Sequence, residues 1–405
     1  MVSESFRSDV VIVGAGPSGA TASLFLAKMG IAHTLLDAAV FPRDKVCGDG
    51  LDLKVLRVLR HLDPEIVERE IIENQNFTPN YGTRFFTQNG RATDFIHREK
   101  PLFWTAKRLH FDDFLVQKID PRFADFRQGT SVEKIERDGS EWRVFARSGE
   151  KEIEIRTPLL LGADGDHSAV LHHLGQRKID RRHYAASLRQ YWRGVEGIHP
   201  LNLIEIYFPP GLPMSYFYIF PLQNGEANVG YGMVSQVVAQ GGHKLREEFA
   251  RLIQRDPIMS PRFRNAAPLE ESVGWGIPLA SRRRRAFGDG YLLLGDAASL
   301  VCPTSGEGIG TGMMSGYIAA HFVQNALKNK RFDADQFKNY DREIYRRLNG
   351  EIRLYNLMMH LSPRIYAFGL NLLAPNPIFQ WSFRRRVGGW LKTAYETEIE
   401  VRVSS

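Results

Sequence analysis

Short, mostly apolar runs alternate with helical repeats along the first part of the chain and again near residue 300. The runs are three or four residues long, each is followed by glycine or aspartate, and they cover residues 10–13, 33–36, 159–161 and 291–294. Such runs are typical of strands buried on both faces of a parallel sheet. The patterns beside them predict helices over residues 18–29, 51–62, 111–119 and 309–327. Together they indicate an α/β fold.

The middle of the chain follows a different pattern. Residues 73–105 alternate weakly, and turns rich in proline or glycine separate predicted strands over residues 188–195, 204–208, 217–221 and 227–233. A helix is predicted over residues 243–255. After Lys330 the pattern is helical and amphipathic, with strongly apolar stretches at residues 354–361 and 365–373.

These changes of pattern divide the chain into three parts. We expect an α/β domain over residues 1–72, 104–175 and 276–330, and a β-rich domain over residues 73–103 and 176–275. A helical region is expected over residues 331–405. The α/β domain is therefore discontinuous, and the β-rich domain is inserted into it.

The first apolar run leads into a glycine-rich turn. Gly14, Gly16 and Gly19 form the pattern G-x-G-x-x-G between a strand and a small-residue helix. In this context the first glycine permits a tight turn, the second lets a pyrophosphate approach the backbone, and the third allows close helix packing. Asp37 ends the next predicted strand, near the usual position of a carboxylate that binds a ribose hydroxyl. The segment predicts a dinucleotide site.

A second glycine-rich turn follows the apolar run at residues 291–294. A helix that begins in such a loop presents free backbone N–H groups and the positive end of its dipole. These groups suit anionic or electron-rich oxygens, and a carboxylate just after the strand can hold a ribose or ribityl hydroxyl. An ordinary strand–loop–helix connection is the alternative. The residues concerned are Gly295, Asp296, Pro303, Gly306, Gly308 and Ile309.

The amino-acid composition limits the classes of function that the protein can have. The chain has 405 residues, of which 43% are hydrophobic and 24% charged, as in ordinary globular proteins. The net charge of +7 favours anionic partners such as nucleotides or a membrane surface, but no nucleic-acid-binding module is recognisable. The two cysteines, Cys47 and Cys302, fit a reducing compartment. Without a signal-peptide pattern or an apolar run of about 18 residues, the chain is expected to be cytoplasmic.

Four further motifs support a family resemblance. They are Ala163-Asp164-Gly165, Arg108 before an amphipathic helix, a Pro-x(4)-Cys-Gly stretch at residues 42–48, and Tyr-Phe-Tyr-Ile-Phe-Pro at residues 216–221. With the two glycine-rich turns, these motifs are similar to those of FAD-dependent oxidoreductases of the aromatic-hydroxylase type, in the branch of the geranylgeranyl reductases. The resemblance covers residues 8–325.

The resemblance implies a Rossmann-like FAD-binding domain, an inserted antiparallel β-sheet substrate domain and a C-terminal helical region. In that fold the backbone near Val132 lies against the adenine, and the helix starting at Ile309 points at the flavin. No metal is implied. The implied cofactor-binding residues are Gly14, Gly16, Pro17, Ser18, Gly19, Asp37, Arg43, Cys47, Gly48, Gly50, Arg108, Val132, Asp164, Gly295, Asp296, Pro303, Gly306, Gly308 and Ile309.

Cys47 is the candidate catalytic residue. It lies in a loop with Arg43, Lys45 and two glycines, and the resemblance places it beside the flavin ring. When the flavin gives a hydride to one carbon of a double bond, an acid must protonate the other carbon, and Cys47 is the expected acid. Closure of the cofactor loop and simple packing are the alternatives.

An aromatic cluster is expected to line a pocket for a long apolar substrate. Tyr216, Tyr218 and Phe220 share one face of a predicted strand, and Trp192 and Trp275 are further candidates. A plain hydrophobic core is the alternative. Tyr218 stands where the family usually has tryptophan, which bears on the identity of the substrate.

The resemblance implies that the chain reduces isolated C=C bonds of a prenyl, geranylgeranyl-type lipid. The alternative is an FAD-dependent monooxygenase or halogenase that acts on an aromatic or apolar substrate, although the Trp-x-Trp-x-Ile-Pro stretch of halogenases is missing. NADPH or a protein would donate the electrons. The run Arg282–Arg285 is either a solvated loop or a phosphate site. The C-terminal helices either cap the core or contact the inner face of a membrane, with Arg384–Arg386 facing lipid phosphates.

Overall fold

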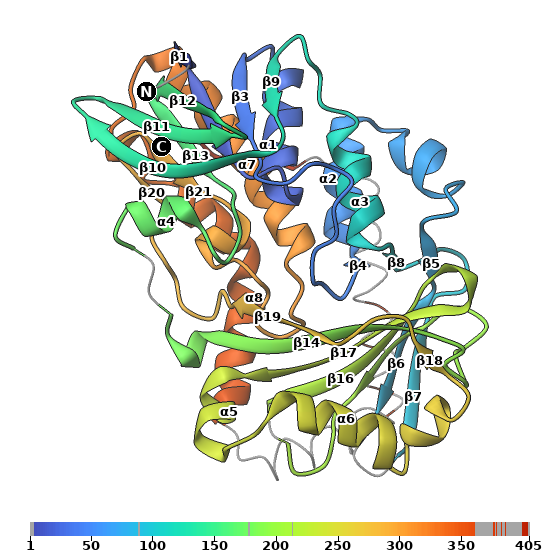
Figure 1. The fold of residues 1–405 in the computed structure, drawn as a ribbon. Helices are drawn as coiled ribbons and strands as arrows, with labels where there is room; N and C mark the ends of the chain where they lie inside the picture. The colour runs from blue at the N-terminus through green and yellow to red at the C-terminus, as the bar shows by residue number, and fades with distance from the viewer. Residues whose placement is uncertain are drawn as a thin grey trace.

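The computed structural model describes residues 4–87, 90–176, 179–212, 214–360, 376, 378, 382, 385 and 399–403. In this part of the chain an α/β domain lies over a β-rich domain, and two long helices run beside them (Figure 1). This arrangement confirms the predicted fold class.

The α/β domain is built on a six-stranded sheet of order β20–β21–β13–β2–β3–β9, parallel except for its β20–β21 edge. Every residue of β2, β3, β13 and β21 is buried, as the apolar runs predicted. A second sheet, β1–β12–β11–β10, packs against it. The strands of both sheets are β1 (Glu4–Arg7), β2 (Val10–Val13), β3 (His33–Leu36), β9 (Ala124–Arg127), β10 (Thr130–Asp138), β11 (Glu141–Ser148), β12 (Lys151–Thr157), β13 (Leu159–Gly162), β20 (Phe287–Gly288) and β21 (Tyr291–Leu293).

The β-rich domain contains a mainly antiparallel sheet of order β18–β14–β17–β16–β15–β6–β7, with β19 also paired to β14. Its outer face packs on helix α6 (Leu245–Arg255), below the sheet in Figure 1. Strand β19 crosses the domain boundary expected at residue 276. The strands are β6 (Gly82–Phe86), β7 (Ala92–Ile96), β14 (Tyr184–Arg193), β15 (Ile204–Tyr207), β16 (Ser215–Pro221), β17 (Glu226–Val234), β18 (Ala267–Pro268) and β19 (Val273–Pro278).

A small sheet of order β4–β8–β5 links the two domains, with bounds Gly50–Leu51, Phe103–Thr105 and Thr78–Asn80. The remaining α-helices are α1 (Pro17–Lys28), α2 (Leu53–Leu62), α3 (Arg108–Val116), α4 (Ala169–His173), α5 (Ser235–Gly241), α7 (Ile309–Asn329) and α8 (Tyr340–His360). Short 3-10 or π turns cover Val67–Ile71, Arg181–His183, Gln223–Gly225, Ser260–Phe263, Gly295–Ala298 and Ala334–Phe337.

Several predicted bounds were wrong for local reasons. The strand expected over residues 188–195 begins at Tyr184 and ends at Arg193, because Gly194 has a φ of +78° that ends the extended conformation. The helix expected over residues 243–255 starts at Leu245, after the left-handed Gly242 that closes α5. The helix expected over residues 111–119 runs from Arg108 to Val116.

The chain after α7 turns into α8, and ring contacts join the two helices at Phe322 and Tyr340. The apolar stretch predicted at residues 365–373 and the side chains of Arg384 and Arg386 lie outside the described residues. Among the helices that the structure describes, none has both the length and the apolar character needed to cross a bilayer.

Candidate active site

A cavity of 1480 Å³ lies between the α/β domain and the inner face of the β-rich sheet. It exceeds the roughly 300–1,000 Å³ of a typical small-molecule site, so it has room for a large cofactor and a substrate. Most of the predicted site residues line it: Gly14, Gly16, Pro17, Ser18, Asp37, Arg43, Cys47, Gly48, Gly50, Arg108, Val132, Asp164, Tyr216, Tyr218, Phe220, Trp275, Gly295, Asp296, Gly306, Gly308 and Ile309. Gly19, Pro303 and Trp192 do not.

The first glycine-rich turn forms one end of the cavity. Gly14 has a φ of +98°, and a β-carbon there would lie 2.5 Å from the Ala163 carbonyl oxygen. A β-carbon at Gly19 would overlap the Gly14 carbonyl oxygen, so Gly19 packs α1 against β2 behind the cavity wall. The Asp37 carboxylate accepts hydrogen bonds from the amides of Ala15, at 2.6 Å, and Ala39, at 2.8 Å. Asp37 therefore fixes the turn as well as lining the cavity.

The start of α7 forms another wall. Its N-cap residue, Gly308, supplies no side-chain cap. Gly306 has a φ of +71°, and a β-carbon there would overlap the hydroxyl of Tyr216, so the close contact between this loop and β16 requires glycine. Burial raises the pKa of Asp296, although the Lys45 ammonium 3.8 Å away opposes the shift. Pro303, which was expected among the cofactor-binding residues, is buried in the loop and does not line the cavity.

Two arginines share one buried carboxylate beside the cavity. Arg108 donates two hydrogen bonds of 2.6 Å to Asp112, one turn along α3, and Arg43 forms an ion pair of 2.7 Å with the same residue. The Cys47 side chain lies within hydrogen-bonding reach of Arg108. Burial alone would lower the pKa of Arg108, but the Asp112 carboxylate raises it overall. A fixed positive charge therefore lies next to the candidate catalytic thiol.

The Ala-Asp-Gly motif contributes a carboxylate whose partners are local. Asp164 accepts hydrogen bonds from the Ser168 hydroxyl, at 2.6 Å, and the Val170 amide, at 3.1 Å, at the start of α4. Burial raises its pKa. Val132 lies at an irregular step in the β10–β11 pairing and lines the same end of the cavity.

Strand β16 separates its side chains between two faces, as alternation predicted. Tyr216, Tyr218 and Phe220 line the cavity, whereas Phe217 and Ile219 pack in the core against α6. The Tyr216 hydroxyl donates to the Ser305 carbonyl oxygen at 3.0 Å, and the Tyr218 and Phe220 rings pack against Gly48. The aromatic cluster therefore joins the loop before α7 to the Cys47 loop.

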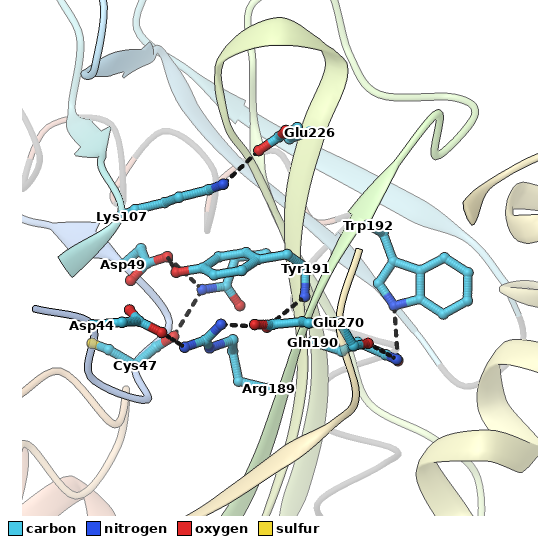
Figure 2. A network of polar contacts seen from close by, with 11 residues as sticks. Asp44, Cys47, Asp49, Lys107, Arg189, Gln190, Tyr191, Trp192, Glu226 and Glu270 are labelled. Atoms are coloured by element: carbon cyan, nitrogen blue, oxygen red, sulfur yellow. Dashed lines mark hydrogen bonds and ion pairs between the residues drawn. The ribbon is translucent and has the colours of Figure 1, made fainter. Parts of the chain in front are cut away.

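The two tryptophan predictions had opposite outcomes. Trp275 lines the cavity, with the Lys45 ammonium 4.9 Å from its ring centre. The expectation for Trp192 was wrong, because the side chain lies on the outer face of β14 and its ring centre is 5.0 Å from that of Phe263. Figure 2 shows Trp192 pointing away from Cys47.

Sequence reasoning missed a buried polar network behind Cys47 (Figure 2). The Asp49 carboxylate accepts hydrogen bonds of 2.7 Å from Tyr191 and from Asn228, and the Asn228 amide also donates to the Cys47 carbonyl oxygen at 2.8 Å. Arg189, almost fully buried, pairs with Asp44 at 2.6 Å and with Glu270. In the sequence, the position of Asp49 between Gly48 and Gly50 could have drawn attention to this residue. Its hydrogen-bond partners could not be predicted, because they come from the distant strands β14 and β17.

The Arg282–Arg285 run holds a loop in place. Arg282 pairs with Asp180 at 3.3 Å, Arg283 donates to Asn349 at 2.7 Å, and the Arg285 guanidinium lies 4.6 Å from the ring centre of Phe287. These contacts favour the loop interpretation over a phosphate site.

The residues present fit FAD. Helices α1 and α7 both begin at the cavity with glycine N-caps, so backbone N–H groups at these two helix starts can face pyrophosphate and ring oxygens. In the first turn of α7 the Gly310 amide already donates a hydrogen bond to the Glu307 carboxylate. The cavity continues from the first turn to the second past the Cys47 loop. An extended dinucleotide can therefore contact both turns.

A family model described as an FAD binding domain matches residues 7–348. The chain is 25% identical over 361 residues to a digeranylgeranylglycerophospholipid reductase of Methanococcus vannielii, covering 87% of each chain. It is 30% identical over 331 residues to a menaquinone reductase of Mycolicibacterium smegmatis, covering 78% of this chain and 76% of the relative.

Solved structures share the fold at low identity. A geranylgeranyl bacteriochlorophyll reductase-like protein of Thermoplasma acidophilum matches with a TM-score of 0.80 and 19% identity, covering 96% of this chain and 97% of that one. A flavin-dependent brominase matches with a TM-score of 0.75 and 19% identity, covering 95% and 94%.

Proposed function

The chain belongs to the family of FAD-binding flavoproteins, in the geranylgeranyl reductase branch, and we propose that it reduces isolated C=C bonds of a prenyl lipid. The observation that carries this proposal is the apolar lining of the cavity. Phe85, Phe95, Phe103, Ile204 and Ile206 form part of this lining, which is called the apolar trough below. A long hydrocarbon chain suits an apolar surface of this extent.

FAD, when bound and reduced, supplies a hydride to one carbon of the double bond. The residues of the Gly14 turn and Asp37 would hold its adenosine half, and those from Gly295 to Ile309 its ring half. The N-terminal end of α7 would place partial positive charge beside the ring, which favours the anionic reduced form.

Cys47 supplies the proton for the second carbon. Its side chain lines the cavity and lies within hydrogen-bonding reach of Arg108, which is buried and oriented by Asp112. A thiolate left after proton transfer is stabilised by this guanidinium. The Cys47 backbone is fixed by Asn228, so the thiol is presented from a defined position.

An anaerobic assay tests this function. Photoreduced protein is incubated with geranylgeranyl lipids, and mass spectrometry should detect products heavier by two hydrogen atoms. Cys47→Ala should lower turnover by roughly 100-fold or more, the usual contribution of a general acid. The control Cys302→Ala, at a buried thiol outside the cavity lining, should retain turnover.

One result would decide against the reductase, and another against the role of Cys47. Product that forms in step with O₂ consumption would identify a monooxygenase instead. Full turnover by Cys47→Ala would remove the acid role from Cys47 but leave the reductase assignment intact.

We further propose that the lipid enters from a membrane surface. Helix α8 exposes Leu354 and Leu357, and Leu354 also lines the cavity. Exposed apolar side chains at a cavity entrance suit contact with lipid. Co-sedimentation with anionic vesicles should decrease in a Leu354→Ser/Leu357→Ser variant, and unchanged binding would argue against this entry route.

The electron donor is either NADPH or a reduced protein. The contacts of the Arg282–Arg285 run within the protein leave no particular support for NADPH. Anaerobic bleaching of the flavin absorbance by NADPH alone would identify the nucleotide, and bleaching that needs an added redox protein would identify the other donor.

A further inference from the structure

Asp49 occupies an unusual position. It is fully buried and has a φ of +64°, a conformation that a residue other than glycine rarely adopts. Its Oδ2 atom accepts both hydrogen bonds of the network, while Oδ1 is buried and has no partner among the described residues. An unpaired carboxylate oxygen is costly to bury, but a protonated one is much less so.

The protonation of Asp49 is balanced near neutrality. Burial raises its pKa to about 7, against the opposing hydrogen bonds from Tyr191 and Asn228 and the charges of Arg189 and Arg108. Arg189 lies 4.0 Å from the ring centre of Tyr191 and is held by Asp44 and Glu270. Asp49 can therefore both hold and release a proton at physiological pH.

Tyr218 lies where it can connect this carboxyl to the thiol. Its ring packs directly over Gly230, where any β-carbon would overlap it, and its hydroxyl would lie 3.5 Å from a β-carbon at Gly48. Gly48 separates Cys47 from Asp49. Burial raises the pKa of Tyr218 well above its ordinary value, and the charges of Tyr216, Cys47 and Asp49 raise it further. The phenol hydroxyl therefore lies beside the Gly48 backbone that joins the thiol residue to the carboxyl residue.

Resting on the proposed function, we propose that Asp49 and Tyr218 return to Cys47 the proton that it donates in each catalytic cycle. Tyr218 gives its hydroxyl proton to the Cys47 thiolate, and Asp49 gives its carboxyl proton to the Tyr218 oxygen. One S–H bond forms and the O–H bond of Tyr218 is restored, while Asp49 becomes a carboxylate. No group is oxidised or reduced.

The need for an internal proton source follows from the cavity. A cofactor and a lipid chain that fill it exclude water from Cys47, so a thiolate formed there cannot readily recover a proton from solvent. The carboxylate left on Asp49 is stabilised by Tyr191, Asn228, Arg189 and Arg108, which already surround it. Tyr218 is then a catalytic residue, whereas Asp49 acts through it as a positioning residue and proton store.

The test uses the full-length flavoprotein under continuous photoreduction with geranylgeranyl lipid. Turnover is measured from about pH 6 to about pH 9, and the flavin absorbance shows separately whether re-reduction limits the rate. Wild-type turnover should fall as the pH rises through about 7, because Asp49 then loses its proton. Asp49→Asn should lower turnover at pH 6 by at least about tenfold and abolish this pH dependence.

Tyr218→Phe and Asp256→Asn complete the test. Tyr218→Phe keeps the ring over Gly230 and removes the hydroxyl, so it should reproduce the loss and the flat pH profile even if Asp49→Asn folds poorly. Asp256→Asn changes a second buried Tyr–Asp pair, with Tyr207 on the outer side of the same sheet, and should retain the wild-type profile.

The outcomes separate this inference from the function on which it rests. Wild-type protein that forms no reduced lipid would contradict the proposed function. Reduced lipid with an unchanged pH profile in both Asp49→Asn and Tyr218→Phe would overturn the proton route alone. An equal loss at every pH with the wild-type profile retained would assign these residues a structural role and overturn the route as well.

Discussion

At the scale of single residues, the candidate site combines fixed charges with groups that titrate. Arg108 and Asp112 form a buried ion pair, while Asp49 lies two residues from Cys47 and burial raises its pKa to about 7. Asp112 is paired with Arg108 and Arg43, whereas the hydrogen bonds to Asp49 come from Tyr191 and Asn228, which carry no positive charge. A carboxyl of this kind costs stability when it ionises, and such costs are typical of functional sites.

Asp49→Asn should change stability in a pH-dependent way. Between about pH 4 and pH 7 the folded protein holds a proton on Asp49 that the unfolded chain has released, so this group stabilises the fold at low pH. That contribution is lost as the pH rises through about 7. The free energy of unfolding of Asp49→Asn relative to wild type should therefore rise between pH 5 and pH 8, by on the order of a few kcal/mol. Melting curves with an equal difference at both pH values would contradict it.

At the scale of elements, the two helices that begin at the cavity also cross each other. Gly316 of α7 lies against α1 so closely that a β-carbon would overlap the Ser18 carbonyl oxygen. Gly312, one turn earlier, has more room, with the nearest atom to its β-carbon position being the Ser18 β-carbon at 3.6 Å. The crossing holds both helix starts in place, so packing and cofactor binding depend on the same contact.

Gly316→Ala and Gly312→Ala should have opposite effects. Gly316→Ala should lower the free energy of unfolding by about 1–3 kcal/mol, because the helices must move apart. Gly312→Ala should leave it unchanged or raise it by up to about 1 kcal/mol, because alanine favours the helix. Urea denaturation measures both. Equal destabilisation by the two variants would contradict the predicted difference between the two positions.

At the scale of the whole molecule, the cavity lies where the two domains meet, and the small β4–β8–β5 sheet links them. The α/β domain supplies the two glycine-rich turns, and the inner face of the β-rich sheet supplies the apolar trough. Neither domain forms the site alone. The space available to the substrate is therefore a property of the assembled fold, and it should limit the length of the substrate.

Ile206→Trp should shorten the accepted substrate. Ile206 lines the trough from β15, whereas its neighbour Tyr207 is buried on the outer face. A larger side chain there should lower turnover of a geranylgeranyl lipid by roughly tenfold or more while sparing a geranyl analogue. Ile206→Val is the matched control and should retain both activities. An equal loss of turnover with both substrates would indicate that the lipid lies elsewhere in the cavity.

The sequence by itself determined the features that depend on neighbours along the chain. Gly14, Gly16 and Gly19 predict a strand–turn–helix unit, because each of these positions has a local steric requirement for glycine. The shared face of Tyr216, Tyr218 and Phe220 follows from the two-residue period of a strand. The apolar runs predicted the parallel sheet, because strands that are covered on both faces are apolar throughout.

The tertiary structure decided which face of each strand meets the cavity and which distant groups meet behind Cys47. Trp192 and Trp275 looked equivalent in the sequence, but only the packing of α6 against the outer face sends Trp192 away from the site. The bonds from Asp49 to Tyr191 and Asn228 span 142 and 179 positions of the chain. Contacts over such separations leave no local pattern, because they arise from the pairing register of strands that fold together only in three dimensions.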